Sequence, residues 1–110
     1  MASEPEVGRK NDTGKLRYDL LAPDALEGLV KVLTFGATKY EDRNWERGIK
    51  YSRVFGALMR HLWAWWRRKP CDDETNLSHL DHAACCLHFL SAYEKRLGMA
   101  KLFDDRPTNG

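Results

Sequence analysis

The chain has 110 residues, of which 43% are hydrophobic and 31% are charged. This length fits one domain, and the composition is that of a folded globular protein, which excludes a wholly disordered chain. The 18 Lys and Arg residues against 16 Asp and Glu leave a formal charge of only +2. A nucleic-acid partner is therefore not expected from net charge, and any anion site must come from a local cluster.

The cysteines and the N-terminal segment bear on the cellular compartment. Cys85 and Cys86 are adjacent, Cys71 is distant in sequence, and the chain has no CxxC pair, so a disulfide framework is not expected. Met1–Lys10 lacks the apolar core of a signal peptide, and no apolar run approaches the roughly 20 residues of a membrane span. We expect a cytoplasmic protein with no membrane partner.

Polar segments with Pro and Gly predict flexible tails over residues 1–12 and 103–110, around one folded domain over residues 13–102. The first predicted helix of that domain runs from Pro23 to about Tyr40, because proline suits the first helical turn and apolar residues then recur at helical spacing. The recurring apolar residues are Leu26, Val30, Leu33 and Ala37.

An ordered loop over residues 41–51 precedes the second predicted helix, for which Ser52 is a candidate N-cap and Pro70 a stop. The third predicted helix starts after Ser78, which resembles a capping box with Asp81, and ends near Gly98. The apolar stripes of these helices are Phe55, Met59, Leu62 and Trp66, with Val54, Leu58 and Trp65 beside them, and Leu80, Ala83, Ala84, Leu87 and Leu90.

No segment shows strand alternation, so the predicted fold class is all-α: a small bundle of three main helices. Three helices form a thin core. Trp63, Trp65 and Trp66 place more aromatic surface on one helix than a single subunit readily buries. The sequence therefore predicts a homo-oligomer, either a dimer or a tetramer.

Three histidines are candidate functional residues. His61 shares a helix face with Val54 and Leu58, so it is either a hydrogen-bonded core histidine or a functional group that faces inward. His79 and His82, three residues apart, can address one ion or one phosphate. The alternative is that His79 merely occupies the first helical turn and His82 packs beside an aromatic ring.

Carboxylates near these histidines suit magnesium, which prefers oxygen ligands. The acidic loop contributes Asp72, Asp73 and Glu74, and Glu27 lies on the polar side of the first predicted helix. The alternative is a solvated acidic loop. Zinc is not expected, because there is no CxxC pair, no HExxH motif and no evident third ligand for His79 and His82.

The chain contains neither a Walker motif nor GxGxxG, so any phosphate site must be assembled from side chains. Exposed basic residues can bind phosphates but more commonly solvate the surface, and a loop tryptophan is either a base-stacking platform or a packing residue. The candidate substrate contacts are Lys15, Arg17, Lys39 and Arg60 for phosphates, Asn44 for a base or sugar edge, and Tyr40 or Trp45 for base stacking.

Four segments together resemble a bacteriophage family, the dATP/dGTP diphosphohydrolases, which is linked to the all-α NTP pyrophosphatase (MazG-like) superfamily. The segments are GKLRYDLL (residues 14–21), LTFGATKYEDRNWERG (33–48), LMRHLWAWWR (58–67) and SHLDHAAC (78–85). The resemblance covers about residues 12–93. The EExxE and ExxD helices that mark the wider superfamily are absent in that form, and Glu27 is followed by Gly28 instead of a second carboxylate.

The resemblance implies an oligomeric, all-helical enzyme of the host cytoplasm that uses Mg²⁺ or Mn²⁺ to cut a purine deoxynucleoside triphosphate into dNMP and pyrophosphate. It makes Glu27, His61 and His79 catalytic candidates. Glu27 and the acidic loop that holds Asp72, Asp73 and Glu74 become metal or catalytic candidates, of which Glu27, Asp73 and Glu74 are the expected metal ligands. Lys39, Asn44 and Trp45 become nucleotide contacts, and His82 joins the other candidate substrate contacts. Two alternatives stay open: a binder of the same fold that sequesters a nucleotide without turnover, and a helical nucleic-acid or protein interaction module using Arg60, Arg67, Arg68, Lys69 and the tryptophans.

Overall fold

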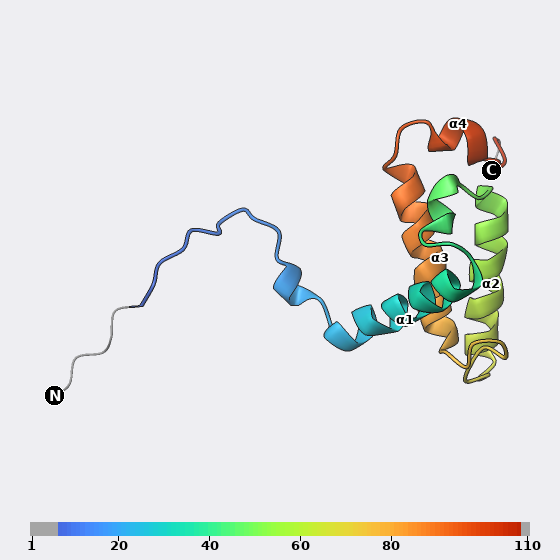
Figure 1. Cartoon of the computed structure of the whole chain (residues 1–110), viewed down its shortest axis with the longest axis horizontal. Coiled ribbons are helices and arrows are strands. Elements are labelled where there is room, and N and C mark those ends of the chain that lie inside the picture. The colour runs from blue at the N-terminus through green and yellow to red at the C-terminus, as the bar shows by residue number, and fades with distance from the viewer. Residues whose placement is uncertain (1–6, 109–110) are drawn as a thin grey trace.

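Two helices that lie side by side carry the core of the computed structural model, which describes residues 7–108 (Figure 1). These are α2 (Tyr51–Trp66) and α3 (His79–Glu94). Helix α1 (Pro23–Lys39) lies crosswise and packs on α3, while the short α4 (Met99–Phe103) lies at one end of the pair. Two 3₁₀ turns, Tyr18–Leu20 and Asn44–Arg47, flank α1, and the described residues contain no β-strand.

The all-α class and the three predicted helices are confirmed. Two of the three residues predicted to start these helices do so. Pro23 is the first residue of α1, and the Ser78 hydroxyl accepts the Leu80 N–H at 3.1 Å, which caps α3. The prediction that Ser52 caps α2 is wrong. Lys50 holds that position, and the Ser52 N–H, inside the first turn, donates to the Asp105 carboxylate at 2.8 Å.

The core lies between α2 and α3, and its centre is Tyr93, which has no exposed surface. The Tyr93 hydroxyl donates to the Trp45 carbonyl at 2.6 Å, and burial raises the pKa of this phenol to about 12. This bond ties the loop after α1 to the far end of α3. The buried core residues are Tyr51, Val54, Leu58, Ala83, Cys86 and Tyr93.

Several residues of the predicted apolar stripes are exposed in the single chain. Leu26 and Val30 of α1 are about half exposed, and Trp66 of α2 is 70% exposed. On α3, Leu80 and Leu87 are exposed while His79 and Cys86 are buried. The reason is geometric: one chain offers too few neighbours to cover every apolar face of three helices.

The N-terminal arm, residues 15–22, extends away from the helical body (Figure 1). A compact domain of this length has a radius of gyration of roughly 13 Å, whereas the Cα atoms here give 19.4 Å. The arm nevertheless carries the exposed apolar side chains of Leu16, Tyr18, Leu20 and Leu21, and Leu26 and Val30 of the following helix are also exposed. The arm therefore presents apolar surface that the rest of the chain does not cover.

Residues beyond α4 contact the start of α2. The Asp105 carboxylate accepts hydrogen bonds from the Ser52 N–H and hydroxyl, and the Arg106 guanidinium lies 5.8 Å from the Tyr51 ring centroid. These contacts involve part of the segment predicted as a tail over 103–110, whereas residues 1–6 and 109–110 of the predicted tails lie outside the described residues. Over residues 7–108, no helix has both the length and the apolarity to cross a membrane.

Two glycines of α1 provide a matched test of the α1–α3 contact. A Cβ added at Gly28 would overlap the carboxylate of Asp81 on α3, whereas a Cβ added at Gly36 would meet nothing within 4 Å. We predict that Gly28→Ala changes the free energy of unfolding less favourably than Gly36→Ala, because the Asp81 carboxylate, at the end of its side chain, must turn aside. Gly36→Ala is predicted to raise the free energy of unfolding by about 0.5–1 kcal/mol through lower chain entropy.

Urea denaturation followed by circular dichroism measures both values. Equal effects of the two substitutions would contradict the close packing of α1 on α3 at Gly28.

Candidate functional site

Three histidine rings from two helices meet at the α2–α3 interface and form, with Asp72 and Thr75, what we term the histidine cluster. Nδ1 of His61 lies 2.9 Å from Nδ1 of His79, so one nitrogen donates a hydrogen bond and the other accepts it. The His61 ring also stacks on His82, with centroids 4.5 Å apart and planes 9° from parallel. His79 is only 5% exposed, whereas His61, His82 and Asp72 are partly buried, so the cluster lies at the edge of the interior.

Helix periodicity explains how the histidines come together. His61 lies one turn after Leu58 and two turns after Val54, both of which are buried against α3. His79 and His82 occupy the first turn of α3. The face that builds the core of α2 thus also directs His61 toward α3.

The loop between α2 and α3 places Asp72 beside these rings. Backbone bonds from Asp72 N–H to the Leu77 carbonyl (2.9 Å) and from Asn76 N–H to the Asp72 carbonyl (2.8 Å) close the loop. The Oδ2 atom of Asp72 accepts the N–H groups of Glu74 and Thr75, each at 3.0 Å. The Thr75 hydroxyl lies 2.6 Å from Nε2 of His82, so the loop is joined directly to the rings.

The surroundings favour the neutral imidazoles of His61 and His82 and the ionised carboxylate of Asp72. Burial lowers the pKa of His61, and the neighbouring His82 and His79 lower it further. Burial also lowers the pKa of His82, although the Asp72 charge opposes this shift. For Asp72 itself burial would raise the pKa, but the backbone N–H bonds from Thr75 and Glu74 outweigh it and the pKa is lowered.

A pocket of about 260 Å³ opens between α1, the loop after it and α3, and it borders the cluster at Thr75 and His82. Aromatic and aliphatic side chains form most of its wall, with Lys39 and Asn44 among the polar lining residues. The ring-bearing lining residues are Phe35, Tyr40, Trp45, His82 and Phe89. The pocket has the apolar character and the few polar groups typical of small-molecule sites.

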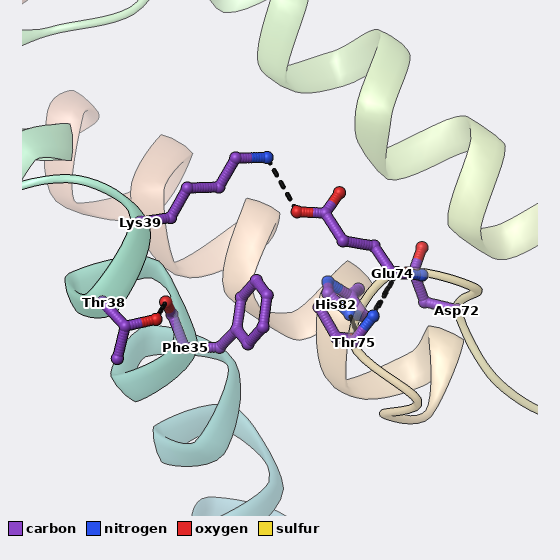
Figure 2. Close-up of polar contacts among 7 residues, drawn as sticks. All are labelled: Phe35, Thr38, Lys39, Asp72, Glu74, Thr75 and His82. Carbon is purple, nitrogen blue, oxygen red and sulfur yellow. Dashed lines mark hydrogen bonds and ion pairs between the residues drawn. The ribbon is translucent and has the colours of Figure 1, made fainter.

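An ion pair links α1 to the loop beside the pocket (Figure 2). The Lys39 ammonium on α1 lies 2.7 Å from the Glu74 carboxylate. This contact raises the pKa of Lys39, which stays charged. Figure 2 shows Phe35, from the same helix, and His82, from α3, below this ion pair and between α1 and the loop.

The carboxylates predicted as metal ligands do not converge in the structure. Glu27 is exposed and pairs with Lys31 at 3.5 Å, and Asp73 is 87% exposed and pairs with Lys69 at 2.8 Å. Glu74 pairs with Lys39 instead. The donors that do converge are two imidazoles and one carboxylate, from His61, His79 and Asp72, which is not the all-oxygen set that Mg²⁺ prefers.

The predicted substrate contacts fall into two groups. Lys39, Tyr40, Asn44, Trp45 and His82 line the pocket together. Lys15 and Arg17 lie on the exposed N-terminal arm, where Arg17 pairs with Asp19 at 2.6 Å, and Arg60 is exposed on α2.

Trp45 is engaged in packing as well as in the pocket wall. Its ring stacks on Phe89 with centroids 5.1 Å apart, and the Arg96 guanidinium lies 5.0 Å from the ring centroid. The packing alternative for Trp45 is therefore correct, although the residue also borders the pocket.

Thr75 is the cluster member that no sequence pattern indicated, whereas Asp72 was indicated only together with Asp73 and Glu74, as part of an acidic loop. A usable signal was present in the spacing: an Asp followed three residues later by Thr forms a turn in which the carboxylate accepts the loop N–H groups. The N–H groups hold such a carboxylate against the loop backbone, so it does not extend into solvent. Asp73 and Glu74 lack this bonding and point to surface lysines.

Comparisons with known proteins address the family of this chain. A family model described as dATP/dGTP diphosphohydrolase, N-terminal, matches residues 5–106. A protein of Salmonella phage PMBT28 named dATP/dGTP diphosphohydrolase is 39% identical over 84 residues, which make up 76% of this chain and 29% of the relative. The chain thus spans less than a third of the length of that relative. No solved structure shows a significant match to the present chain. Because the matched residues include the whole histidine cluster and the neighbouring pocket, we conclude that the chain belongs to the dATP/dGTP diphosphohydrolase N-terminal family.

Proposed function

We propose that this protein binds a purine deoxynucleoside triphosphate and hydrolyses it to dNMP and pyrophosphate. The family and the name of the phage relative support this reaction. The observation that carries the proposal is the shared wall between the pocket and the histidine cluster, formed by Thr75 and His82. A ligand held in the pocket would therefore have its reacting atoms next to the imidazoles.

The size of the pocket supports binding of the base end of a nucleotide. Pockets of about 300–1,000 Å³ bury drug-sized ligands, so the 260 Å³ here suits a base and part of its sugar. The aromatic wall provides faces for the base. The charged phosphates would then reach the polar part of the pocket wall, where Lys39 offers a cation and Asn44 a hydrogen-bonding amide.

The proposed reaction is attack of water on the α-phosphorus, with cleavage of the bond to the oxygen that bridges the α and β phosphates. Pyrophosphate leaves with that oxygen, and the attacking water gives up a proton. The imidazoles of His61 and His82, whose pKa values burial lowers, are neutral at pH 7 and can accept a proton. We propose His61 and His79 as catalytic residues, with Glu27 on α1 as a further candidate.

A divalent cation is part of the proposal, because free triphosphates are handled as metal complexes and their charge must be neutralised during transfer. The expectation of Mg²⁺ or Mn²⁺ from the sequence is retained for the ion that accompanies the substrate. The separated positions of Glu27, Asp73 and Glu74 give no support to a protein-bound magnesium held by those three residues.

The experiment that tests the function is incubation of the purified chain with each dNTP and NTP, in Mg²⁺, Mn²⁺ or EDTA, and identification of the products by mass. We predict dNMP and pyrophosphate from dATP and dGTP, with no reaction in EDTA. A nucleotide that co-purifies and is never turned over would instead identify a sequestering binder.

His79→Ala serves as the control against a contaminating hydrolase. Loss of a general acid or base typically lowers the rate by 10²- to 10⁴-fold, so this variant should lose at least that factor while its circular dichroism spectrum stays helical. Glu27→Gln tests whether the carboxylate on α1 is also needed for hydrolysis, and full turnover in that variant would remove Glu27 from the mechanism.

Substitution of Lys39 tests whether phosphates lie on the α1 side of the pocket. A hydrogen bond to a charged group contributes about 1.5–3 kcal/mol, so Lys39→Gln should weaken nucleotide binding by roughly tenfold or more. Lys69→Gln is the matched control, because Lys69 forms a similar exposed ion pair with Asp73 but does not line the pocket. Calorimetric titration with a non-hydrolysable dNTP analogue measures both; equal weakening would refute a specific role for Lys39.

We also propose that a second copy of the chain covers the N-terminal arm. The arm exposes Leu16, Tyr18, Leu20 and Leu21, and lone apolar segments of this kind are covered in stable proteins by a partner. Light scattering coupled to gel filtration should give a dimer or tetramer mass, and Leu20→Asp with Tyr18→Asp should shift it toward the monomer. A monomer at micromolar concentration in the unmodified protein would overturn this proposal.

A further inference from the structure

The histidine cluster contains the donor set of a transition-metal site. One ligand atom from each of His61, Asp72 and His79 lies within 4.8 Å of the other two. Imidazole nitrogens suit zinc, iron, cobalt and nickel, whereas magnesium takes oxygen donors. The three donors come from α2, the following loop and α3, segments that are separate in sequence and converge at one point, where His79 is buried and the other two are partly buried.

Distances within the cluster are close to those that a bound ion requires. Zinc binds imidazole nitrogens at about 2.0–2.1 Å in a tetrahedral arrangement, so two such nitrogens lie about 3.4 Å apart. The Nδ1 atoms of His61 and His79 are 2.9 Å apart and already face each other. A small separation of the two rings would admit the ion between them.

The two imidazole donors have only each other as hydrogen-bond partners among the described residues, so an ion could replace the bond that they share. His79 is nine-tenths buried, its Nδ1 points at another imidazole, and its Nε2 has no partner among the described residues. A buried histidine with an unsatisfied nitrogen costs stability, which is typical of a residue kept for function. In Asp72, Oδ2 takes the loop N–H bonds, while Oδ1 accepts no hydrogen bond from the described residues.

We propose that His61, Asp72 and His79 bind one divalent transition-metal ion, with zinc as its representative. Three protein ligands leave a fourth position of a tetrahedral ion open, as in catalytic zinc sites. Thr75 would orient the site from outside, since it bonds both Asp72 and His82. The metal site coincides with the site of the proposed hydrolysis. Any catalytic role of the ion rests on that proposed function, whereas binding of the ion does not.

Metal binding is measured on the full chain after dialysis against chelator and metal-free buffer. Titration with Zn²⁺ by calorimetry should give one ion per chain, and elemental analysis after desalting should give the same ratio. Co²⁺ provides an independent readout, because a low-symmetry four-coordinate site produces visible absorption that aqueous Co²⁺ lacks. Asp72→Asn and His61→Gln should each weaken Zn²⁺ binding by tenfold or more.

Two neighbouring substitutions are matched controls. Asp73→Asn changes the adjacent, exposed carboxylate, and His88→Gln changes another histidine of α3 that packs beside Trp45, with ring centroids 5.1 Å apart. Both should retain the ion. The proposal is overturned if the unmodified chain binds no Zn²⁺, or if Asp73→Asn weakens binding as much as Asp72→Asn. Should a ligand variant fail to fold, the thermal shift produced by Zn²⁺ in the unmodified chain and in Asp73→Asn still decides between these outcomes.

The same samples separate the metal site from the reaction. Zn²⁺ bound at one per chain without hydrolysis of any nucleotide would support the site and remove the proposed function. Hydrolysis with Mg²⁺ in a chain that binds no Zn²⁺ would support the proposed function and overturn the metal site.

Discussion

The contact between α2 and α3 is the interaction on which the remaining structure depends. It buries Val54 and Leu58 against Ala83 and Cys86, and continuing the same faces toward the loop brings His61 opposite His79. Burial of apolar area provides the favourable free energy, while the imidazoles, which lose hydration there, reduce it. The packing that stabilises the bundle thus also holds polar groups in a place where they are costly.

The remaining parts of the site attach to this pair of helices through short contacts. The loop before α3 is fixed by its own backbone bonds and carries Asp72 and Thr75. Helix α1 approaches α3 closely at Gly28 and reaches the loop through Lys39 and Glu74. The pocket exists because α1 lies crosswise and leaves space near its C-terminal end. Its shape therefore depends on α1 staying in place.

Helices and their inward histidines could be predicted from the sequence, whereas the partners of each face could not. The spacing of His61 from Val54 and Leu58 correctly indicates an inward position, because one periodicity governs all three. Leu26 and Val30 have the same periodic signal but stay exposed, since periodicity identifies an apolar face without identifying what covers it. Among the loop carboxylates, composition favours none. Asp72 differs from Asp73 only through the turn that it forms with Thr75.

The Lys39–Glu74 ion pair has a consequence for how the site distinguishes substrate from product under the proposed function. Glu74 already acts as a counter-ion for Lys39, so an incoming phosphate must displace a carboxylate before it gains that cation. A triphosphate carries enough charge to compete, whereas a monophosphate competes less well. An occupied cation of this kind would act as a charge threshold, favouring entry of the triphosphate and departure of the monophosphate through the same opening.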